Sequence, residues 1–512
     1  MSEQTDKIRD HLIFLYSEND ATNAFEELNW RMEDFQKKNP KLSSEKRTDV
    51  LFDQKDVVLI TYPDQVRKTG QAPLRTLGDF LKNTVSGMIK TVHLLPFFPY
   101  SSDDGFAVKD YRSVDPQLGS WEDVEEIGND FNLMFDAVIN HVSSESKWFQ
   151  KCLEGDPKFR DYFIEIDDSW DLSRVVRPRD KPLTLQVEIE GVKKRFWTTF
   201  SEDQIDLDYS NPEVLLEIID ILLLYVERGA RIIRLDAIAY LWKKSGSTCI
   251  HLEEAHRIVR LIRAVLDEVA PEVVLITETN VPHEQNVSYF GNGKREAQMV
   301  YQFSLPPLVL HSFITSDAGA LSCWANNLEF PTGEATFFNF LASHDGIGLR
   351  PAEGILNESE VDRMVENTLD NSGRISYKKD SNGGKSPYEL NISYFDALSD
   401  PQAEEPLDLQ ASRFLSSQAI MLAFRGVPGI YFHSLFGSRN WNEGVKKTGR
   451  KRTINREKIS CQELKEELKR PGSLRFRVFR GFEKLLSARL SERAFGPKSG
   501  QRVIDLGDGV FS

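Results

Sequence analysis

The segment Arg231–Ala237, with the sequence RIIRLDA, determines the fold that we expect. It is a short apolar run of the kind that forms a buried strand, and it ends on an aspartate. Two further apolar runs end in a similar way, with ITET at Ile276–Thr279 and SHDG at Ser343–Gly346. Each run predicts a strand that carries a carboxyl side chain at its C-terminal end. The three side chains are Asp236, Glu278 and Asp345.

In total, eight short apolar runs are separated by helical patterns, and they predict an α/β protein with a (β/α)8 TIM barrel. The predicted strands are Val57–Pro63, Val92–Pro99, Leu133–Asn140, Arg231–Ala237, Val273–Glu278, Met299–Leu305, Thr336–Ala342 and Gly429–His433. Chemistry in this fold takes place at the C-terminal ends of the strands. The polar residues at or just beyond these ends are Asp64, Asp103, His141, Asp236, Glu278 and Asp345. The strand pattern and the polar residues therefore indicate the same end of one barrel.

The rest of the chain predicts additions to this barrel. The expected segments are an N-terminal helical extension (1–50), the barrel (51–141 and 209–490), an inserted domain B (142–208), a lid (350–411) and the start of an incomplete C-terminal β domain (491–512). The two insertions are too long to be simple loops. The first contains segments that suggest hairpins, RPRDKP and GVKKRFW, and the second is rich in Gly, Ser and Asn around residues 381–386, which predicts a loop-rich lid.

The composition is that of an ordinary globular protein, with 40% apolar and 28% charged residues among 512. A net charge of −15 argues against binding to nucleic acid or to an anionic membrane surface. The four cysteines show no zinc spacing and are interpreted as reduced thiols. The first twenty residues contain no signal-peptide pattern, and the longest apolar stretch, Ile218–Val226, is too short to span a membrane. We therefore expect a cytoplasmic protein.

The three carboxyl groups suit the transfer of a sugar with retention of configuration, which needs one attacking carboxylate and one carboxylic acid. Because side chains alternate along a strand, Arg234 and Asp236 share a face, and the guanidinium is expected to keep the carboxylate ionised. Glu278 stands between two aspartates, so its pKa is expected to be raised, which lets it hold a proton for the leaving group.

Each motif alone also has a structural explanation. Arg234 and Asp236 could close a strand end as a buried ion pair, and Glu278 could begin a surface loop. Asp345 could cap a helix. The segment Asp136–His141, DAVINH, adds a histidine at the tip of the third strand. Four such motifs, at the ends of four predicted strands, favour a catalytic site over four unrelated structural features.

DAVINH, RLDA, ITET and SHDG resemble the four short conserved regions of the α-amylase superfamily, glycoside hydrolase family 13. The resemblance covers essentially the whole chain from about residue 57 onward. It implies three catalytic roles: nucleophile (Asp236), general acid/base (Glu278) and transition-state stabiliser (Asp345). It also implies three side chains that hold the donor glucose: His141, Arg234 and His344.

Further strings are similar to the sucrose-phosphorylase-like branch of this family, namely SSDDGF (Ser101–Phe106), FWTTFSEDQIDLDY (Phe196–Tyr209) and RTINR (Arg452–Arg456). They imply a closed pocket for one glucosyl unit, which Asp103 and Arg452 grip and Phe106 lines. Within the branch, STCIHLE, ITETNVPHEQNVSYFG and VYQFSLPPLVLH resemble glucosylglycerate phosphorylases. The implied reaction moves glucose between 2-O-α-glucosyl-D-glycerate and inorganic phosphate by double displacement, gives α-glucose 1-phosphate and needs no cofactor.

The residues expected around the acceptor depart from sucrose phosphorylases. Asn280 stands where those enzymes carry a histidine, Val176 where they carry an aromatic residue and Glu389 where they carry a glutamine. Guanidinium groups suit phosphate and carboxylate ligands, so Arg177 and Arg179 are candidates for either. Two further candidates for substrate contacts are Tyr240 and Tyr388.

Several alternatives stay open at this stage. The substrate could instead be sucrose, glucosylglycerol or sucrose 6'-phosphate, and a hydrolase, a transglucosidase or a non-catalytic relative would keep the same fold. Asn140 resembles a calcium-linked position of many amylases, but the branch implies no metal. The basic run Lys446–Arg452 is interpreted as a solvated loop, except for Arg452. The expected partners are a small glucoside and phosphate, and the sequence does not predict an oligomeric state.

Overall fold

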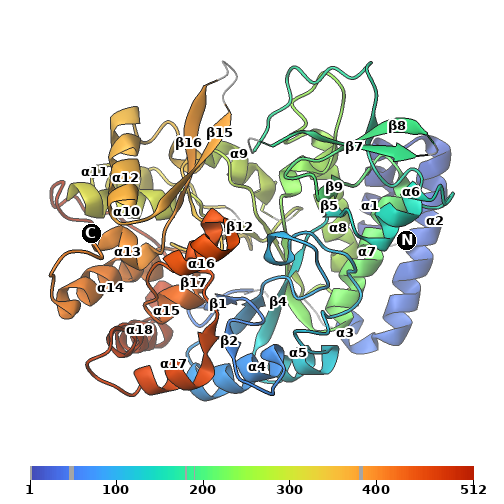
Figure 1. Ribbon diagram of the computed structural model, residues 1–512. Coiled ribbons are helices and arrows are strands. Elements are labelled where there is room, and N and C mark those ends of the chain that lie inside the picture. Colours follow the sequence, from blue (N-terminus) through green and yellow to red (C-terminus); the bar gives the residue numbers. More distant parts are fainter. Residues whose placement is uncertain are drawn as a thin grey trace.

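The computed structural model describes residues 3–44, 51–178, 181–189, 191–293, 295–331, 333–379 and 384–512. Its centre is a closed barrel of eight parallel strands (Figure 1). In chain order these are β1 (Val58–Thr61), β3 (Thr91–Leu94), β4 (Asn132–Ala137), β10 (Ala230–Leu235), β11 (Val274–Thr277), β12 (Met299–Tyr301), β13 (Thr336–Asn339) and β17 (Val427–Tyr431). Each strand lies within or overlaps one predicted run, so the (β/α)8 prediction is confirmed.

The register of the barrel brings the polar strand ends together. Arg234 of β10 pairs with Asp136 of β4 on one side and with Ile276 of β11 on the other. Asp236 and Glu278 therefore follow neighbouring strands at the same end. Directly after Asp236 the chain turns, because Ala237 adopts the left-handed conformation with φ 50°.

Helices surround the strands. Those that cover the barrel are α4 (Pro73–Thr84), α5 (Trp121–Gly128), α7 (Pro212–Glu227), α8 (Glu253–Val269), α10 (Leu305–Thr315), α14 (Leu407–Ala423) and α18 (Leu474–Ser491). Helix α7 begins with an Asn211 cap and a proline at its first position, and it contains the longest apolar stretch of the chain. That stretch is apolar on most sides because the barrel packs on one face and the N-terminal helices on another.

The N-terminal residues form α1 (Glu3–Leu15), α2 (Glu18–Lys38) and α3 (Pro40–Ser44). These helices pack outside α7 and α8 (Figure 1). Arg31 holds α2 to α7 through a 2.6 Å ion pair with Asp220 and a hydrogen bond to the Leu216 carbonyl. The predicted extension 1–50 is thus helical over 3–44, and residues 45–50 lie outside the described part.

The insertion after β4 is built mainly of short strands. They are β5 (His141–Ser143), β6 (Glu165–Ile166), β7 (Thr184–Ile189), β8 (Val192–Trp197) and β9 (Gln204–Asp206), with α6 (Lys147–Leu153) between the first two. β7 and β8 form an antiparallel hairpin that joins β6, and β5 pairs with β9. The GVKKRFW segment forms the second strand of the hairpin, while RPRDKP precedes the first.

The segment after β13 differs from the loop-rich lid that the sequence predicts. It forms β14 (Ile347–Gly348), α12 (Glu358–Asp370), β15 (Arg374–Lys379), β16 (Lys385–Asn391) and α13 (Tyr394–Leu398). Of the Gly- and Ser-rich residues, 385 and 386 belong to β16, and residues 380–383 lie outside the described part. Figure 1 shows the β7–β8 and β15–β16 hairpins on the same side of the barrel.

Residues 491–512, where the sequence predicts the start of a β domain, contain no strand. After α18 the chain forms only a short 3-10 turn, Arg493–Phe495, and then runs without regular structure. The tail is held by single contacts: Phe511 stacks on Phe424 at 5.7 Å, and the Asp508 carbonyl accepts a hydrogen bond from the Ala318 amide. The apolar residues that suggested hairpins, Ile504, Leu506 and Val510, are exposed.

Short elements complete the fold. They are α9 (His283–Val287), α11 (Gly319–Asn326), α15 (Phe432–Leu435), α16 (Asn442–Thr448), α17 (Cys461–Glu467), β2 (Val66–Arg67), β18 (Ile459–Ser460) and the 3-10 turns η1 (Asp103–Gly105), η2 (Ile238–Tyr240), η3 (Ser288–Phe290), η4 (Arg350–Ala352) and η5 (Lys451–Asn455). No helix in the described ranges combines the length and the apolar character that a membrane crossing requires.

Candidate active site

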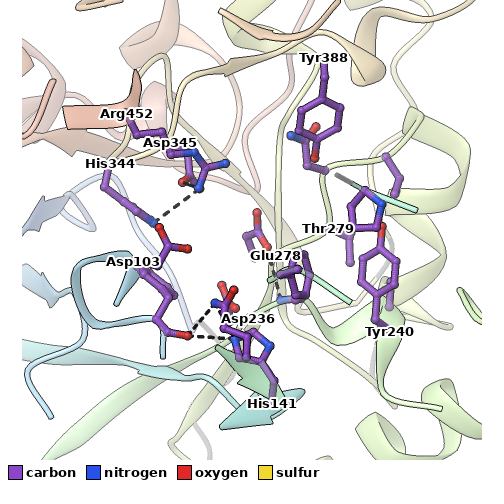
Figure 2. A pocket seen from close by; sticks show the side chains of 18 residues that line it. Asp103, His141, Asp236, Tyr240, Glu278, Thr279, His344, Asp345, Tyr388 and Arg452 are labelled. Atoms are coloured by element: carbon purple, nitrogen blue, oxygen red, sulfur yellow. Dashed lines mark hydrogen bonds and ion pairs between the residues drawn. The ribbon is translucent and has the colours of Figure 1, made fainter. Parts of the chain in front are cut away.

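A cavity opens at the C-terminal ends of the barrel strands. The predicted site residues that line it are Asp103, Phe106, His141, Asp236, Tyr240, Asn280, Glu278, His344, Asp345, Tyr388 and Arg452. Figure 2 shows Asp103, His344, Asp345 and Arg452 on one side, Tyr240, Thr279 and Tyr388 on the other, and Glu278 between them. The structure thus brings together residues from most of the polar strand ends.

Arg234 lies beneath the cavity floor and joins its carboxyl groups. Its Nη1 is 2.8 Å from Asp236 Oδ1 and also pairs with Asp136, while its Nη2 is 3.9 Å from Glu278 Oε2. His93 Nε2 donates to the other oxygen of Asp136 at 2.7 Å. Asp236 and Glu278 therefore share one guanidinium, which keeps them at the same end of the barrel and close together.

The protonation of Asp236 differs in part from the expectation. Burial raises the pKa of the Asp236 carboxyl group, and the adjacent Arg234 guanidinium opposes this shift without cancelling it. Arg234 acts in the expected direction, since it favours the charged form. The sequence pattern did not reveal how completely the carboxyl group is removed from solvent.

Glu278 has the raised pKa that a proton donor needs. Burial is the main cause, Asp236 and Asp345 add to it, and Arg234 opposes it, so that the pKa of Glu278 is raised to about 7. The Ala237 amide lies 3.4 Å from Glu278 Oε2, which fixes the carboxyl group beside the turn that follows Asp236. The direction of the shift agrees with the sequence analysis, but desolvation outweighs the neighbouring charges.

Asp345 is held ionised by several cations. Arg452 Nη1 lies 2.5 Å from its Oδ1, and Arg456 Nη2 lies 3.7 Å from the same oxygen. Burial would raise the pKa of Asp345, but Arg452, His344 and Arg456 outweigh burial and hold the pKa well below its usual range. The cavity therefore combines one carboxyl group that can carry a proton near neutral pH with one that stays negatively charged.

Glu389 lies behind Arg452 and binds it with two parallel bonds, at 3.0 Å from Nε and 2.6 Å from Nη2. The Glu389 side chain is buried, and a Cβ at Gly346 would lie only 2.6 Å from its Cγ. Glu389 was expected to face the acceptor or phosphate. Its carboxylate instead fixes Arg452, although the residue also borders a second cavity outside the first.

The two aspartates of SSDDGF occupy a tight turn. Asp103 and Asp104 both adopt positive φ, 53° and 51°, and a Cβ at Gly105 would lie 2.8 Å from Pro96. Arg456 holds this turn through a 2.5 Å ion pair with Asp104, and its Nε donates to the His344 carbonyl. Backbone strain of this kind persists only where surrounding contacts enforce it, and here it points Asp103 into the cavity.

Two histidines form the wall near Phe106. His141 Nε2 donates to the Phe106 carbonyl at 2.9 Å, and Gln204 donates to the same oxygen at 3.0 Å. The His344 ring stacks on the Phe106 ring at 4.8 Å. Burial lowers the pKa of His344 to about 3, so the imidazole is neutral. It can donate a hydrogen bond to one sugar hydroxyl or accept one from another.

Asn140 belongs to a buried polar cluster rather than to the cavity wall. Its amide donates to Asp206 at 3.0 Å, and its oxygen accepts from Lys243 Nζ at 2.9 Å. Lys243 is buried and also pairs with Asp206 at 2.5 Å. The ammonium group thus supplies positive charge among these oxygen atoms. Over the part of the chain that the structure describes, no set of three or more His, Cys, Asp or Glu side chains is arranged to hold a metal ion.

The acceptor side is formed differently from the expectation. Asn280 lines the cavity, and a Cβ at Gly348 would lie 2.6 Å from its amide, so glycine there makes room for it. Val176 does not line the cavity and donates its amide to Thr248. Arg177 also lies outside the lining, with its guanidinium on the Lys181 carbonyl. Arg179 lies outside the described residues.

Asp64 was expected at the same rim, but it pairs with Arg67 and Lys458 away from the cavity. Several functional neighbours were not singled out from the sequence: His93, Phe200, Gln204, Lys243 and Arg456. Gln204 and Arg456 lie within strings that the resemblance quoted, so their motifs contained a signal. His93 and Lys243 act only through pairings with distant residues, which a single sequence does not display.

The C-terminal rim of the barrel holds three clustered carboxyl groups, a shared guanidinium and a neutral histidine. This arrangement is typical of the active site of a glycoside-processing enzyme. The family model "Alpha amylase, catalytic domain" matches residues 80–329. Glucosylglycerate phosphorylase of Spirochaeta thermophila is 50% identical over 511 residues, which cover 100% of this chain and 86% of that protein. Glucosylglycerate phosphorylase of Escherichia coli is 46% identical over 461 residues, with 90% and 82% covered.

The solved structure of sucrose 6F-phosphate phosphorylase from Thermoanaerobacter thermosaccharolyticum is similar as a whole. It superimposes with a TM-score of 0.77 at 26% identity and covers 91% of each chain. An α-amylase from H. orenii, with a TM-score of 0.64 at 17% identity, shares the fold. The chain belongs to the α-amylase superfamily and, within it, to the family of glucosylglycerate phosphorylases.

Proposed function

We propose that this protein is a retaining α-glucosyl phosphorylase that moves glucose between 2-O-α-glucosyl-D-glycerate and inorganic phosphate. The observation that carries the proposal is the 50% identity to a glucosylglycerate phosphorylase along the full chain. Sucrose and glucosylglycerol phosphorylases are more distant, at 32% and 26% identity. The proposed products of phosphorolysis are α-glucose 1-phosphate and D-glycerate, and we include a cytoplasmic location in the proposal.

In the first half of the proposed reaction, Asp236 attacks C1 of the glucosyl unit. The bond from C1 to the glycerate oxygen breaks, and Glu278 gives its proton to that oxygen. The product of this step is a β-glucosyl ester of Asp236. The pKa of about 7 suits Glu278 to this role, because it holds a proton near neutral pH and can release it.

In the second half, phosphate occupies the position that glycerate has left. Its oxygen attacks C1 from the face opposite Asp236, and the bond between C1 and the Asp236 carboxylate breaks. The phosphate hydroxyl returns a proton to Glu278, which restores the enzyme. Two inversions give a product with the configuration of the donor.

The other side chains support these steps. Asp345 is ionised and lies on the Arg452 side of the cavity, where a carboxylate can stabilise positive charge on the sugar ring. Asp103 and Arg452 are proposed to grip the far hydroxyl groups of glucose, with Phe106, His141 and His344 around the ring. Tyr240, Asn280 and Tyr388 are proposed to contact the acceptor or phosphate, since all three line the cavity and Tyr240 and Tyr388 lie across it from Arg452.

The direct test is to incubate the protein with α-glucose 1-phosphate and one acceptor at a time, and to measure the release of phosphate. D-glycerate is expected to give the fastest release, and glycerol, fructose and fructose 6-phosphate serve as the alternative acceptors. An Asp236→Asn variant controls for contaminating phosphatases. Release of phosphate without an acceptor would favour a hydrolase, and a faster reaction with another acceptor would reassign the substrate.

A further inference from the structure

A second cavity lies directly outside the catalytic one. Five residues border both cavities: Asp103, Pro178, Gln204, Tyr388 and Arg452. Figure 2 labels three of them, with Asp103 and Arg452 on one side of the catalytic cavity and Tyr388 on the other. We call the second cavity the outer cavity. Because the two cavities share a wall, a small molecule in the outer cavity is next to the reaction site.

The outer cavity is rich in cationic side chains. Among the residues that the structure describes, six that line it are basic, namely Lys181, Lys385, Arg450, Lys451, Arg452 and Arg456, and two are acidic, namely Asp103 and Glu389. Arg452 and Arg456 are compensated by carboxylates, since they pair with Glu389, Asp345 and Asp104. The other four side chains add further positive charge to the described lining of the cavity.

These four side chains come from three separate parts of the chain. Lys181 precedes β7, Lys385 begins β16, Arg450 lies between α16 and η5, and Lys451 is the first residue of η5. Arg450 Nη1 lies 4.0 Å from Asp104 Oδ1, at the outer limit of an ion pair. Lys451 Nζ donates to the Ile375 carbonyl at 2.8 Å, a contact that positions the ammonium group without neutralising it.

This local charge contrasts with that of the whole protein, which carries a net charge of −15. A protein with that charge repels anions on average, whereas a cleft lined by cations raises their local concentration and their rate of entry. The proposed function requires two anions, phosphate and glycerate, to reach the catalytic cavity, and it releases a third, glucose 1-phosphate.

We propose that the outer cavity is a vestibule that gathers small oxyanions, inorganic phosphate above all, and delivers them to the catalytic cavity. This inference rests on the proposed function and adds to it the route and the residues that attract the anionic substrate. The basic run Lys446–Arg452, which was interpreted from the sequence as a solvated loop, thus has two parts. Arg450 and Lys451 line the vestibule, while Lys446 and Lys447 on α16 are exposed and do not.

That division supplies a matched pair of variants. R450Q/K451Q removes two positive charges from the vestibule, and K446Q/K447Q removes two from the same run outside it. Removing two charges about 10 Å from a dianion lowers its local concentration by about three- to ten-fold at low salt, and salt screens the effect. Because Lys451 also holds the Ile375 carbonyl, K181Q/R450Q is a second vestibule variant that leaves this bond in place.

The experiment measures kcat/KM for inorganic phosphate at saturating glucosylglycerate, from low salt to about 0.3 M salt. For the wild type we expect kcat/KM to fall with salt. R450Q/K451Q and K181Q/R450Q are expected to start three- to ten-fold lower, mainly through a higher KM, and to depend less on salt. K446Q/K447Q is expected to follow the wild type. A parallel series with D-glycerate in the reverse direction tests whether the second anion uses the same route.

The outcomes separate the two proposals. If the wild type forms glucose 1-phosphate and both vestibule variants match K446Q/K447Q, the vestibule is refuted while the proposed function stands. Equal losses in all three variants would also refute it, because the effect would then follow the charge of the whole protein. If the wild type forms no glucose 1-phosphate, the proposed function fails and the vestibule fails with it.

Discussion

Glu278 shows how burial and charge combine at a single residue. Desolvation and two neighbouring aspartates raise its pKa to about 7, against the opposing effect of Arg234. Asp345, in the same cavity, is equally enclosed but has two guanidinium groups beside it, and its pKa moves in the opposite direction. The two carboxyl groups thus differ in protonation because of their cationic neighbours.

The first prediction concerns the pH dependence of glucosyl transfer from the natural donor. Because Glu278 must be protonated to release glycerate, kcat/KM for glucosylglycerate should fall as the pH rises through about 7. With α-glucosyl fluoride, whose leaving group needs no proton, this decrease should be absent. An identical decrease for both donors would show that another group controls the pH dependence.

The same shift affects stability. The pKa of Glu278 is higher in the folded protein than the value of 4.5 for a free side chain, so the folded state binds the proton more tightly. Protonated Glu278 therefore stabilises the fold at low pH, and this contribution is lost as the pH rises from about 4.5 through about 7. In Glu278→Gln the free energy of unfolding should vary less over this range.

The second prediction concerns the attacking carboxylate. Asp236→Asn keeps the shape of the side chain and an oxygen for Arg234, but it removes the nucleophile. Turnover should fall by at least about 10³-fold, and the melting temperature should change little. The formation of glucose 1-phosphate and thermal unfolding are the two measurements. Activity close to that of the wild type in the purified variant would contradict the assignment.

At the scale of elements, Lys243 connects three parts of the fold. Its ammonium group contacts Asn140 beyond β4, Asp206 in β9 and the Tyr240 carbonyl in η2. It therefore fixes the insertion that follows β4 to η2, the 3-10 turn just after the proposed nucleophile Asp236. A buried cation of this kind is retained only when the surrounding oxygens compensate it, as they do here.

The third prediction is that Lys243→Met lowers the free energy of unfolding by about 3–5 kcal/mol, because Asp206 is left buried without its cation. Lys244→Gln, at an exposed neighbouring position, should have little effect. The double variant K243M/D206N should recover part of the loss. Chemical denaturation measures the free energy of unfolding of all three variants. Equal free energies for K243M and K244Q would contradict the prediction.

The fourth prediction concerns the link between β16 and η5. Glu389→Gln leaves Arg452 with one hydrogen-bond acceptor in place of two charged ones, so Arg452 should hold Asp345 less firmly. We expect a loss of about 1–3 kcal/mol in the free energy of unfolding and a higher KM for the donor. Denaturation and steady-state kinetics measure the two effects, with Glu443→Gln on α16 as an exposed control. No change in either quantity would show that Glu389 does not act through Arg452.

At the scale of the whole molecule, the barrel was predictable because its strands are short, continuous apolar runs. The run before Glu278, for example, forms the fully buried β11. The polar residue after a strand was less informative, since Asp64 and Glu278 both follow strands and only Glu278 lines the cavity. In the C-terminal tail the sequence suggested strands, but residues 491–512 form none, and apolar residues there such as Leu506 are exposed.

The candidate site was predictable as a set of strand ends, but not as a network. Arg456 and Asp104 are separated by 352 residues, and Arg234 and Asp136 by 98. Such pairings depend on how the barrel closes, which the spacing of residues along one sequence does not encode. The catalytic and binding roles of the individual residues accordingly stay predictions until they are measured.

The central claim is that Asp236 forms a covalent bond with the anomeric carbon while Glu278 handles the proton. It is tested most directly by incubating Glu278→Gln with α-glucosyl fluoride in the absence of phosphate, then quenching, digesting and analysing the peptides by mass spectrometry. We predict a single glucosyl group on Asp236. A glucosyl group on another residue, or an unmodified Asp236 while the fluoride is consumed, would contradict the claim.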